Sequence, residues 1–119
     1  MTSAPGGASP PPNDTSRTIA GAQRAVDASI QALGGYWPPL ANLARLFEEC
    51  GELARAINQN HGPKLIKPGE GQAGLEEELG DALYTLFVLA NSLDVDASIA
   101  LDGALAKAAR RAAPSETNG

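Results

Sequence analysis

The chain has 119 residues, of which 43% are hydrophobic and only 4% aromatic, and its formal net charge is −5. This length suits one domain with a core and is too short for two, while the acidic balance argues against a general nucleic-acid binder. Cys50 is the sole cysteine, which excludes an intramolecular disulfide and suits a reducing compartment, so we expect a cytoplasmic protein.

The two ends of the chain are predicted to be tails around a single all-α domain. Residues 1–16 hold four prolines and two glycines with almost nothing to bury, which is typical of disorder and differs from a secretory leader. We place the domain at residues 17–112 and a second disordered tail at 113–119. The longest apolar run, 82–90, is too short to span a bilayer, so no membrane association is expected.

The first half of the domain predicts two amphipathic helices. Apolar residues spaced at three and four predict a helix over 18–33, which Gly34 and Gly35 end. After a short connector, the same spacing predicts a helix over 40–58. Its apolar stripe, which we expect to face the core, consists of Leu40, Leu43, Phe47, Cys50, Ala54 and Ile57.

The second half predicts a loop over 61–74 and two more helices, over 75–93 and 97–111. The stretch 82–90 is apolar nearly all the way round, which is typical of a helix buried on most sides. Four helices with mostly short connections predict an antiparallel four-helix bundle. In so small a chain, we expect the extra packing partner to be another copy, so that homo-oligomerisation completes the core.

Acidic residues cluster on the second and third predicted helices. Residues three and four apart are neighbours on a helix, so Glu52 shares one arc with Glu48 and Glu49, and Glu78 shares another with Asp81. If the two helices form a hairpin, both acidic groups lie a few turns from the loop. The two groups can then face each other at one level.

Converging carboxylates need a counter-ion, because like charges in close contact raise one another's pKa values and destabilise the fold. A hard divalent cation such as Mg²⁺, Mn²⁺ or Ca²⁺ satisfies carboxylate oxygens. Glu78 shares its arc with Leu75, Ala82 and Leu89, and a carboxylate beside an apolar face should be paired or coordinated. From spacing alone, a metal site and a solvated acidic face both remain open.

The segments LFEECGELA (46–54) and EELGDALY (77–84) resemble the MazG-like family of all-α nucleotide pyrophosphohydrolases. That family carries an EExxE helix followed by an ExxD helix, and the likeness covers residues 36–111. The resemblance implies a Mg²⁺-dependent hydrolase, with Mn²⁺ as a possible substitute, that cuts between the α- and β-phosphates. It would convert a (d)NTP to the monophosphate and pyrophosphate, as in housecleaning of the nucleotide pool, and act as a homodimer or homotetramer.

The resemblance also implies roles for particular residues. Glu48 and Glu49 are expected to be catalytic, with Glu48 orienting water or holding a further metal ion. The expected metal ligands are Glu49, Glu52, Glu78 and Asp81.

One departure from the family pattern concerns the phosphates. Lysine and asparagine of the last helix often contact them in the family, but those positions are Ala104 and Ala108 here. This departure keeps open a non-catalytic metal-binding helical oligomer. A phosphoribosyl-ATP pyrophosphatase-like enzyme, which shares the helical layout of acids, is the other alternative. Possible substrate-binding residues are Trp37, Lys64, Lys67, Lys107 and Arg110.

Overall fold

The computed structural model describes residues 17–61 and 71–114. These residues form helices α1 (Ile19–Ala32), α2 (Pro39–His61), α3 (Gly71–Ser92) and α4 (Ala97–Ala112), with no strand in either range. The all-α prediction is therefore confirmed. The predicted N-terminal tail lies outside the described residues, as does all of the predicted C-terminal tail except Ala113 and Pro114.

Local capping explains where α1 and α4 begin. The Thr18 hydroxyl accepts a hydrogen bond from the Gly21 amide at 2.9 Å. The Asp96 carboxylate accepts from the amides of Ser98 and Ile99 at 2.9 and 3.1 Å. Such caps satisfy amides that have no partner within the first turn of a helix, so the predicted starts lie close to the observed ones.

The start of α3 differs from the sequence prediction. Residues 71–74 were expected to belong to a loop, because they include two glycines, but the helix begins at Gly71. Glycine inside a helix costs about 1 kcal/mol relative to alanine, which packing against a neighbouring helix can offset. Here α3 packs against α2 more extensively than any other pair of helices does.

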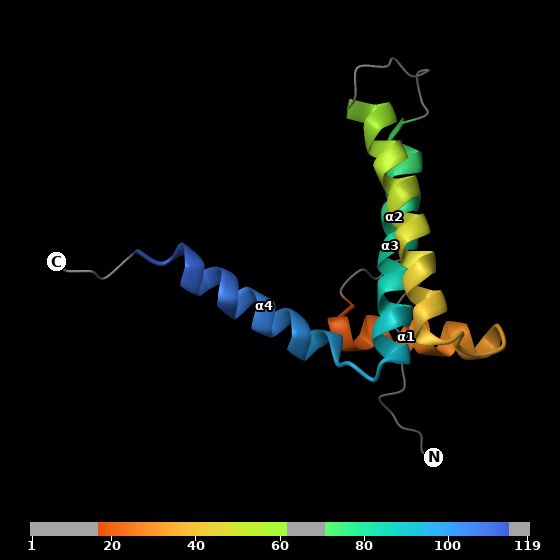
Figure 1. Cartoon of the computed structure of the whole chain (residues 1–119), viewed down its shortest axis with the longest axis horizontal. Coiled ribbons are helices and arrows are strands. Elements are labelled where there is room, and N and C mark those ends of the chain that lie inside the picture. The colour runs from red at the N-terminus through yellow and green to blue at the C-terminus, as the bar shows by residue number, and fades with distance from the viewer. Residues whose placement is uncertain (1–16, 62–70, 115–119) are drawn as a thin grey trace.

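The helices form an antiparallel hairpin with two attached arms. In Figure 1, α2 and α3 run side by side in opposite directions, α1 crosses the base of this hairpin, and α4 extends away from it. The chain measures 59 × 54 × 33 Å. Within one chain the four helices therefore do not close into the expected four-helix bundle.

The side chain of Gln23 on α1 holds the start of α4. Its Nε2 donates to the Val95 carbonyl at 2.7 Å, and its Oε1 accepts from the Ala97 amide at 2.9 Å. The Asn91 side chain on α3 donates to the backbone carbonyl of Gln23 at 3.1 Å. These polar contacts attach the start of α4 to α1.

The predicted apolar stripe of α2 does not form the core of the single chain. Leu40, Phe47 and Ile57 are 79%, 66% and 46% exposed, and Cys50 is exposed as well. The less exposed face of α2 repeats instead at steps of four and three, through Asn42, Leu46, Glu49, Leu53, Ala56 and Asn60. Because α2 carries small and apolar residues on both faces, hydrophobic spacing alone did not identify the face that packs against α3.

The stretch 82–90 of α3 is covered only in part. Thr85 and Val88 are buried, whereas Leu83 and Leu86 remain 49% and 51% exposed. Part of the apolar surface that we expected to be buried against other helices is therefore exposed to solvent in one chain.

By length and hydropathy, no single described helix qualifies as a membrane span, although the bent pair Gly74–Ser92 and Ala97–Ala112 meets that test jointly, with a 108° bend.

Candidate metal centre

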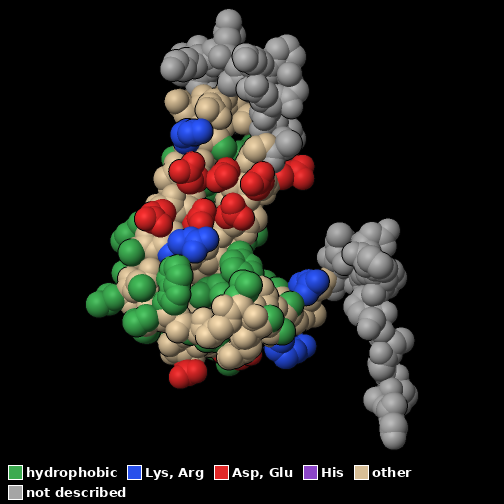
Figure 2. Space-filling model, turned by 90° about the vertical axis from the view of Figure 1, so that its right-hand side faces the viewer, with side chains coloured by type: hydrophobic (Ala, Val, Ile, Leu, Met, Phe, Trp, Pro, Cys, Tyr) green, Lys and Arg blue, Asp and Glu red, His purple; other side chains and the backbone are tan. Residues whose placement is uncertain are grey.

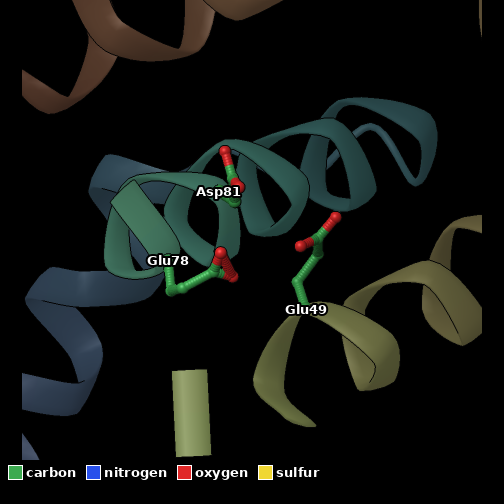
Figure 3. A group of neighbouring side chains, drawn as sticks. All are labelled: Glu49, Glu78 and Asp81. Atoms are coloured by element: carbon green, nitrogen blue, oxygen red, sulfur yellow. The ribbon is translucent and has the colours of Figure 1, made fainter. Parts of the chain in front are cut away.

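Three carboxylates from two helices converge in the seam of the hairpin (Figure 3). Glu49 comes from α2, and Glu78 and Asp81 come from α3. Each offers one oxygen atom that lies within 4.8 Å of the other two. The sequence prediction that the acidic residues of the two helices face each other agrees with this arrangement for these three residues.

The register of the hairpin explains this convergence. Glu49 belongs to the less exposed face of α2, so its side chain points toward α3 and is only 14% exposed. Glu78 is partly buried, as are Leu75 and Ala82 of the same arc. Asp81 is exposed and lies on the solvent side of the group. The cluster is therefore walled by helices on one side and open on the other.

Burial and neighbouring negative charges both act on Glu78. Burial raises the pKa of its carboxyl above its ordinary value, and the negative charges of Asp81, Glu52, Glu77 and Glu49 raise it further. A carboxyl with a raised pKa is one whose ionised form lacks compensation. A bound cation would supply that compensation.

The other two acids of the predicted set lie outside this group of three. Glu48 and Glu52 are both exposed, and neither shares the 4.8 Å spacing. Glu52 is nevertheless close enough for its charge to raise the pKa of Glu78. Glu52 therefore lies near the three converging carboxylates but is not one of them. Figure 2 shows the acidic side chains as a band across the hairpin, above a largely hydrophobic region.

The donor set fits a hard divalent cation. Carboxylate oxygens are the ligands that Mg²⁺ prefers, and at metal–oxygen distances of about 2.1 Å its ligands lie roughly 3 to 4.2 Å apart. Oxygens within 4.8 Å of one another need only small side-chain rotations to reach that spacing. No histidine or cysteine belongs to the group, which disfavours zinc.

Arg45 contacts this centre, and the sequence analysis did not identify it. Its Nε donates to Glu49 Oε2 at 2.9 Å, which is the one ion pair among residues 17–61 and 71–114. This bond raises the pKa of the Arg45 guanidinium. The i, i+4 spacing of the two residues was the signal that could have revealed the pair.

An aromatic cavity of about 190 Å³ lies next to the centre, and Arg45 forms part of its wall. Its polar and aromatic lining consists of Tyr36, Trp37, Asn42, Arg45, Tyr84 and Thr85. The Asn42 amide donates to the Trp37 carbonyl at 3.0 Å and so fixes the connector before α2. Thr85 donates to the Asp81 carbonyl at 2.9 Å, which ties the cavity wall to the turn that carries a metal-site carboxylate.

Two of the remaining predicted substrate-binding residues, Lys107 and Arg110, are described by the structure and lie away from the centre in one chain. Lys107 and Arg110 are exposed on α4, which packs against α1 and extends away from the hairpin (Figure 1). Ala104 and Ala108 lie on the same helix. Lys64 and Lys67 fall outside the described residues.

Known proteins resemble this chain in sequence and in structure. Residues 38–114 match the MazG nucleotide pyrophosphohydrolase domain. The uncharacterized protein YpjD of Bacillus subtilis strain 168 is 46% identical over 92 residues, which cover 76% of this chain and 83% of that protein.

Two crystal structures share the arrangement of helices. That of YpjD has a TM-score of 0.72 and 43% identity, covering 79% of this chain and 97% of that one. That of the Bacillus-conserved MazG protein, a nucleotide pyrophosphohydrolase, has a TM-score of 0.68 and 39% identity, covering 79% and 92%.

Proposed function

The chain belongs to the MazG nucleotide pyrophosphohydrolase family, and we propose that it is a Mg²⁺-dependent enzyme that hydrolyses nucleoside triphosphates to monophosphates and pyrophosphate. The observation that carries this proposal is the meeting of Glu49, Glu78 and Asp81 beside an aromatic cavity. The carboxylates suit a metal-bound triphosphate, and the cavity suits a nucleoside.

The carboxylates would hold Mg²⁺, or Mn²⁺ in its place. Glu49, Glu78 and Asp81 form the inner group, and Glu52 at its border is the fourth proposed ligand. When bound, the cation would neutralise phosphate oxygens and polarise the phosphorus under attack. Because phosphoryl-type transfer depends mainly on positioning and charge stabilisation, a set of fixed carboxylates is a sufficient protein scaffold for it.

The reaction consumes one water molecule. The water oxygen attacks the α-phosphorus, and the bond from that phosphorus to the α–β bridging oxygen breaks. Pyrophosphate leaves with the bonding electron pair, while the proton of the water passes to a base. We assign the orientation of this water, or the removal of its proton, to Glu48, which is exposed beside the metal ligand Glu49.

The nucleoside is proposed to occupy the aromatic cavity. Trp37 is 56% exposed at its edge, where an indole ring can stack on a base. Burial raises the pKa of Tyr36 to about 12, and its hydroxyl donates to Asp27 at 2.5 Å. The hydrogen bond to Asp27 therefore fixes the Tyr36 ring in the wall of the cavity.

A second copy is proposed to complete both the core and the site. Exposed Phe47, Leu83 and Ile99 present apolar surface on three helices, and burying such surface drives association. The acids lie on the hairpin and α4 extends away from it, so the cations Lys107 and Arg110 would reach a bound triphosphate from another copy. A homodimer or homotetramer with closed helical bundles accounts for these features.

Measurement of pyrophosphate release tests this function. Standard and modified NTPs, and phosphoribosyl-ATP as the rival substrate, would be incubated with Mg²⁺, Mn²⁺ or EDTA. We expect metal-dependent release that Glu49→Gln and Asp81→Asn abolish and that Glu76→Gln, an exposed acid of α3 outside the cluster, leaves intact. Failure of the wild-type protein to release pyrophosphate from any nucleotide would refute the proposal. Selective turnover of phosphoribosyl-ATP would assign the rival activity instead.

A further inference from the structure

Arg45 lies between the acidic cluster and the aromatic cavity, and contacts both. Its Nε donates to Glu49 at 2.9 Å, and Arg45 also lines the cavity. The guanidinium carbon is 6.0 Å from the centroid of the Trp37 ring. A ligand that extends from the cavity to the carboxylates can therefore contact this cation.

Helix stability gives little reason for the Arg45–Glu49 pair. Pairs at i, i+4 contribute about 0.2–0.5 kcal/mol, and a cation placed N-terminal to its acid is the less favourable order. Glu49 is also only 14% exposed and points into the seam, unlike a typical surface partner. The pair holds Glu49 in place and leaves most of the arginine donors free for another ligand.

We propose that Arg45 is a substrate-contacting residue whose guanidinium binds the α-phosphate of the nucleotide while its Nε holds Glu49. A guanidinium has five N–H donors in a planar fork that matches phosphate oxygens. The hydrogen bond to Glu49 uses one of them, and no other acceptor among the described residues takes the rest. The guanidinium lies over the Trp37 ring at the outer limit of a cation–π contact, which favours this position for the fork.

The α-phosphate is the group that suits this position. It is the phosphate joined to the nucleoside, so with the base in the cavity it comes to lie between the cavity and the carboxylates. It is also the phosphate retained by the monophosphate product. Because the α-phosphate is a ligand only if the chain binds nucleotides, this role depends on the proposed function.

Comparison of two ligands isolates the contact. Isothermal titration calorimetry in Mg²⁺ would measure affinities for deoxynucleoside monophosphates with the four standard bases and for the matching deoxynucleosides. The proteins compared are wild type, Arg45→Gln, Arg45→Lys and the control Arg24→Gln, which alters an exposed arginine of α1. Circular dichroism would verify that each variant is folded, which we expect because Arg45 is 46% exposed.

We expect Arg45→Gln to weaken monophosphate binding about tenfold or more, since charge-assisted bonds to phosphate are strong, and to leave nucleoside binding within about twofold. Arg45→Lys should lie between, because it keeps the charge without the fork, and Arg24→Gln should match wild type. Mg²⁺ affinity should fall less than monophosphate affinity in Arg45→Gln, because the Glu49 carboxylate itself is retained.

Two results would overturn the assignment. If Mg²⁺ affinity falls while the preference for monophosphate over nucleoside is unchanged, Arg45 only positions Glu49. If neither quantity changes, the pair is an ordinary surface contact. In both cases wild type still binds nucleotide and metal, so the proposed function survives. A wild-type protein that binds neither Mg²⁺ nor any monophosphate refutes the function and the role of Arg45 together.

Discussion

Glu49 of α2 and Asp81 of α3 place carboxylate oxygens within 4.8 Å of each other, with Glu78 in the same group. The two residues belong to separate helices and meet because the hairpin is antiparallel. In a metal-free chain this proximity is unfavourable, since each charge disfavours ionisation of its neighbours. The stability of the protein should therefore respond to both pH and divalent cations.

The pH dependence of the metal-free protein should reveal the repulsion on Glu78. Its folded pKa is raised, so between its unfolded and folded pKa values the native state binds more protons, and stability falls as pH rises. Glu78→Gln stays neutral and should escape this loss. Thermal unfolding in EDTA should give equal midpoints for the two proteins near pH 4, and a higher midpoint for the variant near pH 8.

Addition of Mg²⁺ should reverse that difference at the higher pH. A ligand that binds only the native state stabilises it, so wild type should gain stability and Glu78→Gln should gain much less. The matched control Glu76→Gln should follow wild type at both pH values. Equal pH profiles for wild type and Glu78→Gln would show that the Glu78 carboxyl is not destabilised in the folded chain.

Loss of the Gln23 side chain should loosen α4. The Gln23→Ala variant removes the hydrogen bonds to Val95 and Ala97, each worth about 0.5–1.5 kcal/mol. We expect urea unfolding to show a loss of about 1–3 kcal/mol. Gln31→Ala, an exposed glutamine of the same helix, is the control. Indistinguishable unfolding curves for the two variants would mean that these bonds do not fix α4.

A charge on the outer face of α2 should disrupt assembly. Phe47 is 66% exposed in one chain, and if a second copy covers it, Phe47→Glu would bury an unpaired charge at the interface. Light scattering after size-exclusion chromatography should give the oligomer mass for wild type and for the control Gln59→Glu, and a lower mass for Phe47→Glu. A wild-type protein that elutes as a monomer would contradict the proposed partner.

The bounds of α1 and α4 were well predicted from sequence because their signals are local. The caps Thr18 and Asp96, and the glycines 34 and 35 with positive φ, act on their own neighbours. The face of α2 that meets α3 was not predictable in this way. Apolar and small residues occur on both sides of that helix, so the choice depends on what α3 presents to it.

The convergence of the carboxylates was predictable in part. The spacing of Glu78 and Asp81 and the burial expected for Glu78 agree with the structure. Arg45 was missed because surface-like i, i+4 pairs are common. The attachment of α4 to α1 was missed because the side chain of Gln23 makes it through polar contacts between distant segments, which hydrophobic periodicity does not report.

Titration with Mn²⁺, monitored by calorimetry, tests most directly whether the carboxylates of α2 and α3 bind a divalent cation. We expect saturable binding by wild type and by Glu76→Gln, and affinities lower by about tenfold or more in Glu49→Gln and Asp81→Asn, because each loses a charged ligand. Unchanged affinity in both of these variants, or no binding by wild type, would contradict the account.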